Sequence, residues 1–236
     1  MIDWLDEAGE PNFPNTCEAL DEPNGLLAAG GRLTPKWLDK AYRSGIFPWN
    51  DPDEVRLWWS PAPRAIISPD TFRVPRTVKK LQRRHPDMLV TVNQAFDAVI
   101  EACAEPRSYQ QGTWIDDEII AAFQRLYNNN EAVSVEIWDD SGCLAGGFYG
   151  LIKGQVFFGE SMFSRQTNAS KLAFAAAAPV LFSAGIRLID CQMHTDHLAQ
   201  FGAIEVERHE FETRLARYDA SLRIQKLPAA IRFGVA

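Results

Sequence analysis

The sequence has few cysteines, and they form no recognisable pattern. Cys17, Cys103, Cys143 and Cys191 are far apart and include no C-x-x-C pair. Disulfide frameworks and zinc sites use closely and regularly spaced cysteines, so the sequence favours neither of them. We expect four reduced thiols.

Long apolar runs are also missing. The most apolar stretch, residues 172–184, is shorter than the roughly 20 residues that cross a bilayer, and it contains Pro179. The first residues, Met-Ile-Asp-Trp-Leu-Asp-Glu, have neither the basic start nor the apolar core of a signal peptide. We therefore expect a soluble, cytoplasmic protein that does not associate with membranes.

Lysine and arginine are absent from the first 25 residues. The seven acids there account for the whole excess of 31 acidic over 24 basic residues. The remaining chain is neutral overall, so the net charge of −7 does not exclude an anionic partner such as a nucleic acid. With 236 residues, 46% of them hydrophobic, the chain is large enough to bury a core.

The composition and the predicted secondary structure of the sequence change near residue 62. Before it, residues 1–33 are rich in Pro, Asn and Gly and predict turns and extended segments, followed by a short helix at 35–44. The aromatic, proline-containing stretch 46–64 predicts rigid loops. We expect a small N-terminal domain over residues 1–62 and a larger domain over residues 63–236.

Strands and helices alternate in the larger domain. The predicted helices are 75–84, 94–103, 116–127, 169–184, a short one from 195, and 211–220. The predicted strands are 88–92, 132–138, 144–152, 155–163, 187–193 and 203–208. An antiparallel meander that leads into β-α-β predicts an α/β (α+β) fold with one central mixed sheet.

Three of the seven tryptophans, Trp49, Trp58 and Trp59, lie within eleven positions. They can form a small aromatic core that joins two subdomains. They can also form a flat surface on which a base stacks. The residues alone leave both interpretations open.

A basic ridge follows the aromatic stretch. Its members, between residues 72 and 84, are Arg73, Arg76, Lys79, Lys80, Arg83 and Arg84, and no acid occurs among them. On a helical wheel they lie opposite Val74, Val78 and Leu81, so this helix packs by its apolar side and exposes the bases. In an acidic protein such a surface favours contact with phosphates.

Polar residues at two predicted strand ends are candidates for a site. Glu160 either pairs with Arg165 or points into a cleft, where its carboxylate can bind a cation. The period of two places Asp190 and Gln192 on one face of their strand and Ile189 and Cys191 on the other, which predicts a polar network or a site.

His194 and His197 are spaced so that they can bind a metal. No third ligand has a recognisable spacing, so a role at the end of a helix is favoured. We expect no metal site.

Taken in order, these segments resemble the leucyl/phenylalanyl-tRNA–protein transferases from about Phe13 to Leu215. The matching segments are Gly25–Leu33, Phe47-Pro48-Trp49, Trp58-Trp59-Ser60-Pro61, Gly112-Thr113-Trp114-Ile115, Gly159–Arg165 with Ala169-Ser170-Lys171, and Asp190-Cys191-Gln192. The resemblance implies a small N-terminal domain packed on an acetyltransferase-like (GNAT-like) domain, in a monomer of the bacterial cytosol.

The activity that this resemblance implies is an aminoacyl transfer. Leu or Phe, and also Met, would pass from aminoacyl-tRNA to proteins whose N-terminal residue is Lys or Arg, which marks them for degradation in the N-degron pathway. Replacement of an ester by an amide is downhill, so we expect no cofactor and no nucleotide hydrolysis.

The resemblance also implies roles for individual residues. Asp190 and Gln192 would lie at the reaction centre, where Gln192 orients the acceptor amine, since an amide oxygen is too weakly basic to remove a proton. Glu160 would meet the basic acceptor residue, Trp49 and Trp114 would hold the terminal adenosine, and the basic ridge would bind the tRNA. The donor side chain would enter a pocket of Phe148, Phe157, Phe174, Ala177, Leu181, Ser183 and Ile189.

Two other functions stay open at this point. An acyl-CoA-dependent N-acetyltransferase with the same fold would need a glycine-containing pyrophosphate loop after the central strand, and residues 163–168 contain no glycine. A non-catalytic adaptor that binds protein N-termini would show peptide binding without turnover.

Overall fold

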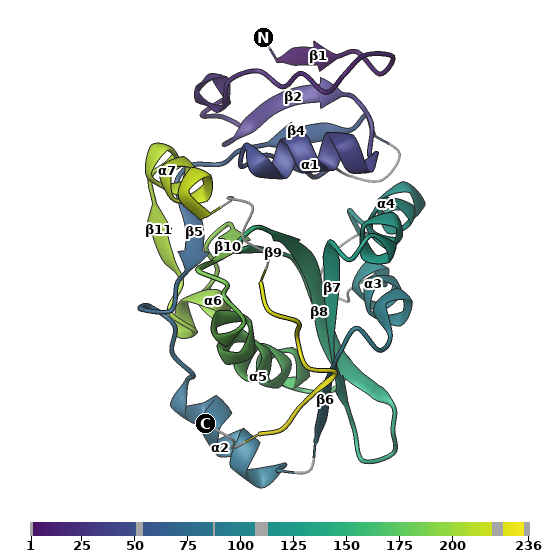
Figure 1. The fold of residues 1–236 in the computed structure, drawn as a ribbon, viewed down its shortest axis with the longest axis vertical. Helices are drawn as coiled ribbons and strands as arrows, with labels where there is room; N and C mark the ends of the chain where they lie inside the picture. Colours follow the sequence, from purple (N-terminus) through teal and green to yellow (C-terminus); the bar gives the residue numbers. More distant parts are fainter. Residues whose placement is uncertain (1, 51–53, 87, 107–112, 219–223, 234–236) are drawn as a thin grey trace.

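The structure, a computed structural model, describes residues 2–50, 54–86, 88–106, 113–218 and 224–233. Its elements form two sheets, each with its own helices (Figure 1). The N-terminal part contains β1 (Asp3–Leu5), the 3-10 helix η1 (Thr16–Glu18), β2 (Leu26–Gly30), α1 (Pro35–Arg43), β3 (Phe47–Pro48) and β4 (Leu57–Trp59).

The remaining elements follow from β5 onwards. The strands are β5 (Arg64–Ile67), β6 (Leu89–Val92), β7 (Ala132–Trp138), β8 (Leu144–Lys153), β9 (Val156–Ser164), β10 (Leu188–Gln192), β11 (Ile204–Val206) and β12 (Ala230–Ile231). The helices are α2 (Arg76–Arg84), α3 (Phe96–Ala104), α4 (Asp117–Asn128), α5 (Ala169–Ser183), α6 (Asp196–Gln200) and α7 (Arg208–Tyr218).

The N-terminal sheet has the order β1-β2-β4-β3. Strands β1 and β2 lie in residues 1–33, for which turns and extended segments were predicted, while β3 and β4 correct the prediction of rigid loops in residues 46–64. Its strands have two to five residues, too short for a period-two pattern, and β2 is buried along its whole length. Trp58 is fully buried beside Phe13 and Trp37, and its indole N–H donates to the Gly30 carbonyl at 2.8 Å. For Trp58, therefore, the aromatic-core interpretation is correct.

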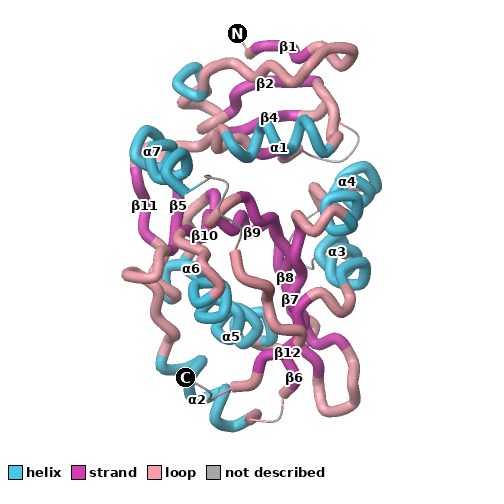
Figure 2. Tube along the Cα trace, viewed as in Figure 1, coloured by secondary structure: helices cyan, strands magenta, loops and turns pink. Residues whose placement is uncertain are grey.

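The larger sheet is mixed, as predicted. Its order is β11-β5-β10-β9-β8-β7-β6-β12, and β9 and β10 run parallel while the other neighbouring pairs are antiparallel. Helix α5 covers one face, and α3 and α4 cover the other (Figures 1 and 2). The predicted α/β class with a central mixed sheet is confirmed.

The helices begin and end within two residues of the prediction except α7, and the predicted cap of α3 is wrong. Asn93 does not cap α3: it has a left-handed φ of 58°, and its side chain accepts a hydrogen bond from the Ser134 amide. The buried carboxylate of Glu136 instead accepts from the Ala95 amide at the start of α3. Helix α7 begins at Arg208, three residues early, and its predicted end at Ala220 lies outside the described residues.

Helix α1 packs towards the larger sheet and is connected to it by a buried cation. Lys153, at the end of β8, is 3% exposed and forms ion pairs with Asp39 on α1, at 2.9 Å, and with Glu131 before β7. Burial of an ammonium group is costly unless it is paired, so these contacts hold the two parts in one arrangement.

Within the described ranges, no helix has both the length and the hydropathy needed to cross a bilayer.

Close backbone packing of β8 against β9 depends on Gly150. A Cβ atom there would lie 2.1 Å from the Phe158 carbonyl oxygen and 2.5 Å from the Phe157 ring. We expect Gly150→Ala to lower the free energy of unfolding by about 1–3 kcal/mol through overpacking. Urea denaturation measures this change.

The matched control is Gly159→Ala on the neighbouring strand, where the nearest atom would be 3.6 Å away. It should change the stability by about 0.5 kcal/mol or less. Equal losses for both variants would contradict the packing argument.

Candidate active site

A cavity of about 860 Å³ opens where the parallel strands β9 and β10 stop pairing. The last pair of their ladder is Phe158 with Asp190. The residues that follow this pair on each strand line the cavity, namely 159–164 and 191–193. The site therefore lies at strand ends, where side chains from different elements converge.

Two β-bulges shape this edge of the cavity. The register between β8 and β9 shifts at Glu160, and the register between β10 and β5 shifts at Cys191. A bulge inserts an extra residue and changes the direction of the side chains around it. The bulge interrupts the alternation predicted for β10: Ile189 and Asp190 lie in different surroundings, the apolar cluster with Phe157 and the ion pair with Arg64, but the register shifts before Gln192.

Asp190 forms a fully buried ion pair with Arg64, the first residue of β5. The guanidinium donates from Nε to Oδ1 at 2.8 Å and from Nη2 to Oδ2 at 2.6 Å, and neither side chain is more than 1% exposed. Arg64 also donates to the Gly45 carbonyl and lies over the rings of Phe47 and Phe211. Both carboxylate oxygens of Asp190 are therefore engaged by Arg64.

What Asp190 positions is Gln192. The backbone N–H of Gln192 donates to Asp190 Oδ1 at 3.0 Å, and Gln192 has a left-handed φ of 56°. A non-glycine residue in this conformation is strained, and such strain persists where surrounding contacts hold it. The ion pair thus holds the end of β10 in the conformation that places Gln192 at the cavity.

Glu160 lies in the cavity wall with an unsatisfied carboxylate oxygen. Its Oε1 is buried and has no hydrogen-bond partner of normal geometry among the described residues, and the same holds for the Tyr149 hydroxyl, while the Tyr42 hydroxyl interacts with the Glu160 carboxyl. Burial raises the pKa of Glu160 to about 8; the Tyr42 hydroxyl and Arg64 act in the opposite direction, and Asp190 raises the pKa further. Arg165 does not pair with Glu160 but with Glu105, so of the two interpretations of Glu160 the one in which it points into a cleft is favoured.

The opposite wall of the cavity is apolar. Phe148, Phe157, Phe174 and Ile189 line it, as predicted for the donor pocket. The other three predicted members do not line the cavity. Ala177 and Leu181 are buried in the same core cluster, while Ser183 is exposed at the end of α5, so its inclusion in the pocket was wrong.

The two predicted adenosine-binding tryptophans both line the cavity but come from different parts of the chain. Trp49 follows β3 and is 37% exposed, and Trp114 lies just before α4. Gly112, which belongs to the same motif as Trp114, lies outside the described residues.

The remaining predicted residues lie apart or play smaller parts. The bases of the basic ridge are exposed on and beside α2, which docks through the buried Val78. Helix α2 lies at the end of the molecule opposite the N-terminal sheet (Figure 2).

His197 lines the cavity, and burial and Lys171 lower its pKa. Among the described residues no group of three metal-binding side chains includes it.

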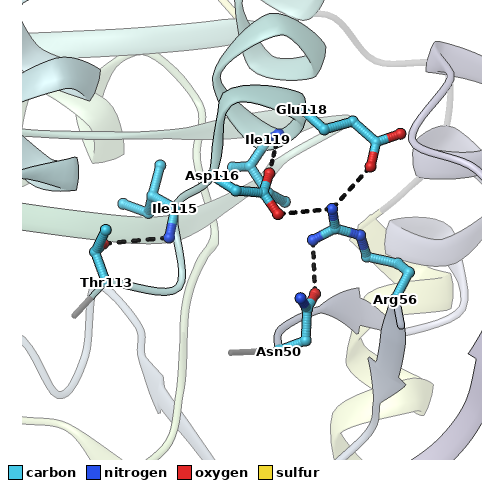
Figure 3. Close-up of polar contacts among 7 residues, drawn as sticks. All are labelled: Asn50, Arg56, Thr113, Ile115, Asp116, Glu118 and Ile119. Atoms are coloured by element: carbon cyan, nitrogen blue, oxygen red, sulfur yellow. Dashed lines mark hydrogen bonds and ion pairs between the residues drawn. The ribbon is translucent and has the colours of Figure 1, made fainter. Parts of the chain in front are cut away.

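Sequence reasoning missed Arg64, Tyr42, Tyr149 and Arg56. No motif marks them, because each acts through a partner distant in sequence. Arg56 joins Asn50 to Asp116 and Glu118 at the start of α4 (Figure 3). The only local signal was that Arg64 ends the aromatic stretch.

A mixed α/β fold with a half-polar, half-apolar cavity at its strand ends is typical of a protein that binds a small molecule or catalyses its reaction. A sequence model of the family described as leucyl/phenylalanyl-tRNA protein transferase matches residues 66–216, and a model of that family's N-terminal domain matches residues 31–62. The chain belongs to this family.

Curated relatives support the same assignment. The chain is 50% identical to the leucyl/phenylalanyl-tRNA–protein transferase of Pseudomonas fluorescens, over 92% of this chain and 95% of the relative. It is 47% identical to that of Cellvibrio japonicus over 92% of both chains, and 51% identical to that of Laribacter hongkongensis over 89% of both. Among solved structures, a GCN5-related N-acetyltransferase-like protein from Streptococcus suis matches with a TM-score of 0.35 and 16% identity, over 74% of this chain and 66% of that one.

The raised pKa of Glu160 makes stability depend on pH. Below the ordinary value of 4.5 the carboxyl is neutral in both folded and unfolded chains, and between 4.5 and about 8 ionisation favours the unfolded chain. Glu160→Gln stays neutral throughout, so we expect its melting temperature relative to wild type to rise from pH 4.5 to about 8 and then level off.

Thermal melts of both proteins at matched ionic strength measure this difference. The control is Glu205→Gln, since Glu205 is an exposed residue of β11. A Glu160→Gln difference that stays constant with pH would show that the carboxyl is not held neutral by burial.

Proposed function

We propose that this protein transfers Leu or Phe from aminoacyl-tRNA to the N-terminal amino group of acceptor proteins. The observation that carries the proposal is the 47–51% identity to leucyl/phenylalanyl-tRNA–protein transferases over about nine-tenths of the chain. The finer assignments are Met as a further donor, acceptors that begin with Lys or Arg, entry into the N-degron pathway, and action in the cytoplasm.

The cavity offers separate surfaces for the two halves of the donor. The apolar wall of Phe148, Phe157, Phe174 and Ile189 suits a Leu or Phe side chain, since burial of such a side chain contributes about 1.5–3 kcal/mol. Trp49 and Trp114 present aromatic surfaces at the same cavity, on which the adenine of the tRNA terminus can stack.

Glu160 and the two buried hydroxyls of Tyr42 and Tyr149 suit the acceptor. A carboxylate oxygen without a partner in a buried wall is stabilised by a cation, and the guanidinium or ammonium of an N-terminal Arg or Lys provides one. Binding of that cation would lower the pKa of Glu160 from about 8 and favour its ionised form.

The reaction needs orientation more than chemical activation. The acceptor amine attacks the ester carbonyl carbon, a C–N bond forms, the C–O bond to the ribose breaks, and the proton that leaves the amine ends on the ribose hydroxyl. The Gln192 amide oxygen accepts a hydrogen bond from the amine and aims it at the ester. Asp190 acts through Gln192, because Arg64 occupies both of its oxygens.

The acetyltransferase alternative is not favoured. The segment between β9 and α5 lacks the glycines of a pyrophosphate loop, and Asn168 at the helix start has a left-handed φ of 67° and makes no side-chain cap. An adaptor would bind protein N-termini as a transferase does but would not transfer an amino acid to them.

A transfer assay tests the proposal. Purified protein is incubated with radiolabelled Leu-tRNA and a protein that begins with Arg, and we expect label in the protein. Gln192→Ala should lower kcat by about tenfold or more, equivalent to about 1.4 kcal/mol of lost transition-state stabilisation.

The matched control is Gln166→Ala, the same substitution outside the cavity, where Gln166 contacts Asp139. It should keep the wild-type rate. Binding of the Arg-bearing protein without label transfer would favour the adaptor, and label from acetyl-CoA would favour the acetyltransferase.

The basic ridge on α2 is proposed to bind tRNA phosphates. Replacement of Arg76, Lys80 and Arg83 by Ala should weaken Leu-tRNA binding and reduce the log–log salt slope by roughly 0.7–0.9 for each phosphate that is no longer bound. Filter binding at several salt concentrations measures this slope. A minimal Leu-adenosine donor should be far less affected, because α2 lies at the end of the molecule opposite the N-terminal sheet (Figure 2), whereas Trp49 directly follows β3 of that sheet.

A charge-matched control replaces the exposed Lys40, Arg187 and Arg217, which lie on other elements. If it changes the slope as much as the ridge variant does, general charge rather than the ridge binds the tRNA.

A further inference from the structure

Arg56 is a buried cation that the reaction chemistry does not use. It precedes β4, its side chain is 8% exposed, and its guanidinium contacts three side chains from two distant segments (Figure 3). Nη1 donates to Asn50 Oδ1 at 2.6 Å, and Nη2 donates to Asp116 Oδ2 and to Glu118 Oε2, each at 2.9 Å.

Each of these segments carries one cavity tryptophan. Asn50 directly follows Trp49, whose backbone is also held by a hydrogen bond from its N–H to the Leu57 carbonyl at 3.0 Å. Asp116 lies two residues after Trp114. Arg56 therefore joins the two segments that carry the cavity tryptophans.

Asp116 links this contact to the backbone beside Trp114. Its Oδ2 accepts from Arg56, and its Oδ1 accepts from the Ile119 amide at 2.7 Å and caps α4. Residues 113–115, directly before it, have no regular structure, and the Thr113 hydroxyl accepts from the Ile115 amide (Figure 3). With Asp116 fixed at both oxygens, the approach of Trp114 to the cavity is fixed as well.

We propose that Arg56 is a positioning residue that sets the separation of Trp49 and Trp114 and thereby the affinity for the adenosine end of the donor. This rests on the proposed function, in which the two tryptophans hold that adenosine. A planar guanidinium suits the role, because its donors diverge in fixed directions, whereas an ammonium group is a point charge.

A purely structural role makes a different prediction, and Lys153 provides the comparison. It too is a buried cation that joins two carboxylates, Asp39 and Glu131, from the two parts of the chain. Neither of its partners adjoins a cavity tryptophan, and Lys153 does not line the cavity. If Arg56 only holds the two parts together, the two residues should behave alike.

The test compares Arg56→Met with Lys153→Met in steady-state transfer of Leu to an Arg-bearing peptide. We expect both to lower the melting temperature. Only Arg56→Met should raise the KM for Leu-tRNA, and for Leu-adenosine, by about tenfold while kcat at saturating donor and the peptide KM stay within about twofold.

A second variant keeps the test valid if Arg56→Met does not fold. Asp116→Asn retains the helix cap, because Asn is as good an N-cap as Asp, but removes the ion pair with Arg56. It should raise the donor KM by about threefold to tenfold with little loss of stability.

The proposal is overturned if the donor KM of Arg56→Met and Asp116→Asn equals that of wild type, or if Lys153→Met raises it equally. Turnover by the wild-type protein is established first, so an unchanged donor KM counts against the positioning role alone. Absence of wild-type turnover would instead count against the proposed function.

Discussion

The buried ion pair between Arg64 and Asp190 is the constraint on which the rest of the site depends. Arg64 opens the larger sheet, directly after the N-terminal part, and reaches back to the Gly45 carbonyl and the Phe47 ring. Asp190 passes the constraint on to the backbone of Gln192. Loss of one partner would leave the other charge buried and unpaired, at a cost of about 3–5 kcal/mol. Through its contacts with Gly45 and Gln192, the same ion pair thus connects the two sheets and fixes the end of β10 beside the cavity.

Polar and apolar side chains line different walls of the cavity. Two bulges, at Glu160 and at Cys191, release the strand ends from regular pairing and let polar groups gather there. The apolar wall continues into the core under α5, where Phe148 and Phe174 pack edge to face. The site is therefore built at strand ends, from side chains that the fold brings together from distant segments.

Much of the fold could be predicted from the sequence, because long periodic segments report their own structure. Helix α5 and strands β7 to β9 were predicted closely, since their patterns extend over many residues. The N-terminal strands were missed because two to five residues carry too little pattern, and Pro48 indicated a loop. The start of α3 was misplaced because Glu136, far away in the chain, satisfies the helix end.

Site residues could be predicted where strand patterns and the family resemblance pointed to them. They could not be predicted where contacts between distant segments determine their position. Gln192 and Glu160 were identified, and both lie at the cavity. The alternation on β10 is interrupted at Cys191 because a bulge cannot be seen in a single strand's sequence, and Ser183 was misplaced because its residue is exposed at the end of α5. Arg64 and Arg56 went unnoticed because their partners lie 126 and 60 residues away.

A crystal structure with phenylalanyl-adenosine, its ester replaced by a stable amide, would locate the donor site. We expect the adenine against Trp49 and Trp114, the phenyl ring among Phe148, Phe157 and Phe174, and the carbonyl carbon next to Gln192. An adenine bound elsewhere, or a phenyl ring outside the apolar wall, would contradict the claim that this cavity holds the donor for transfer.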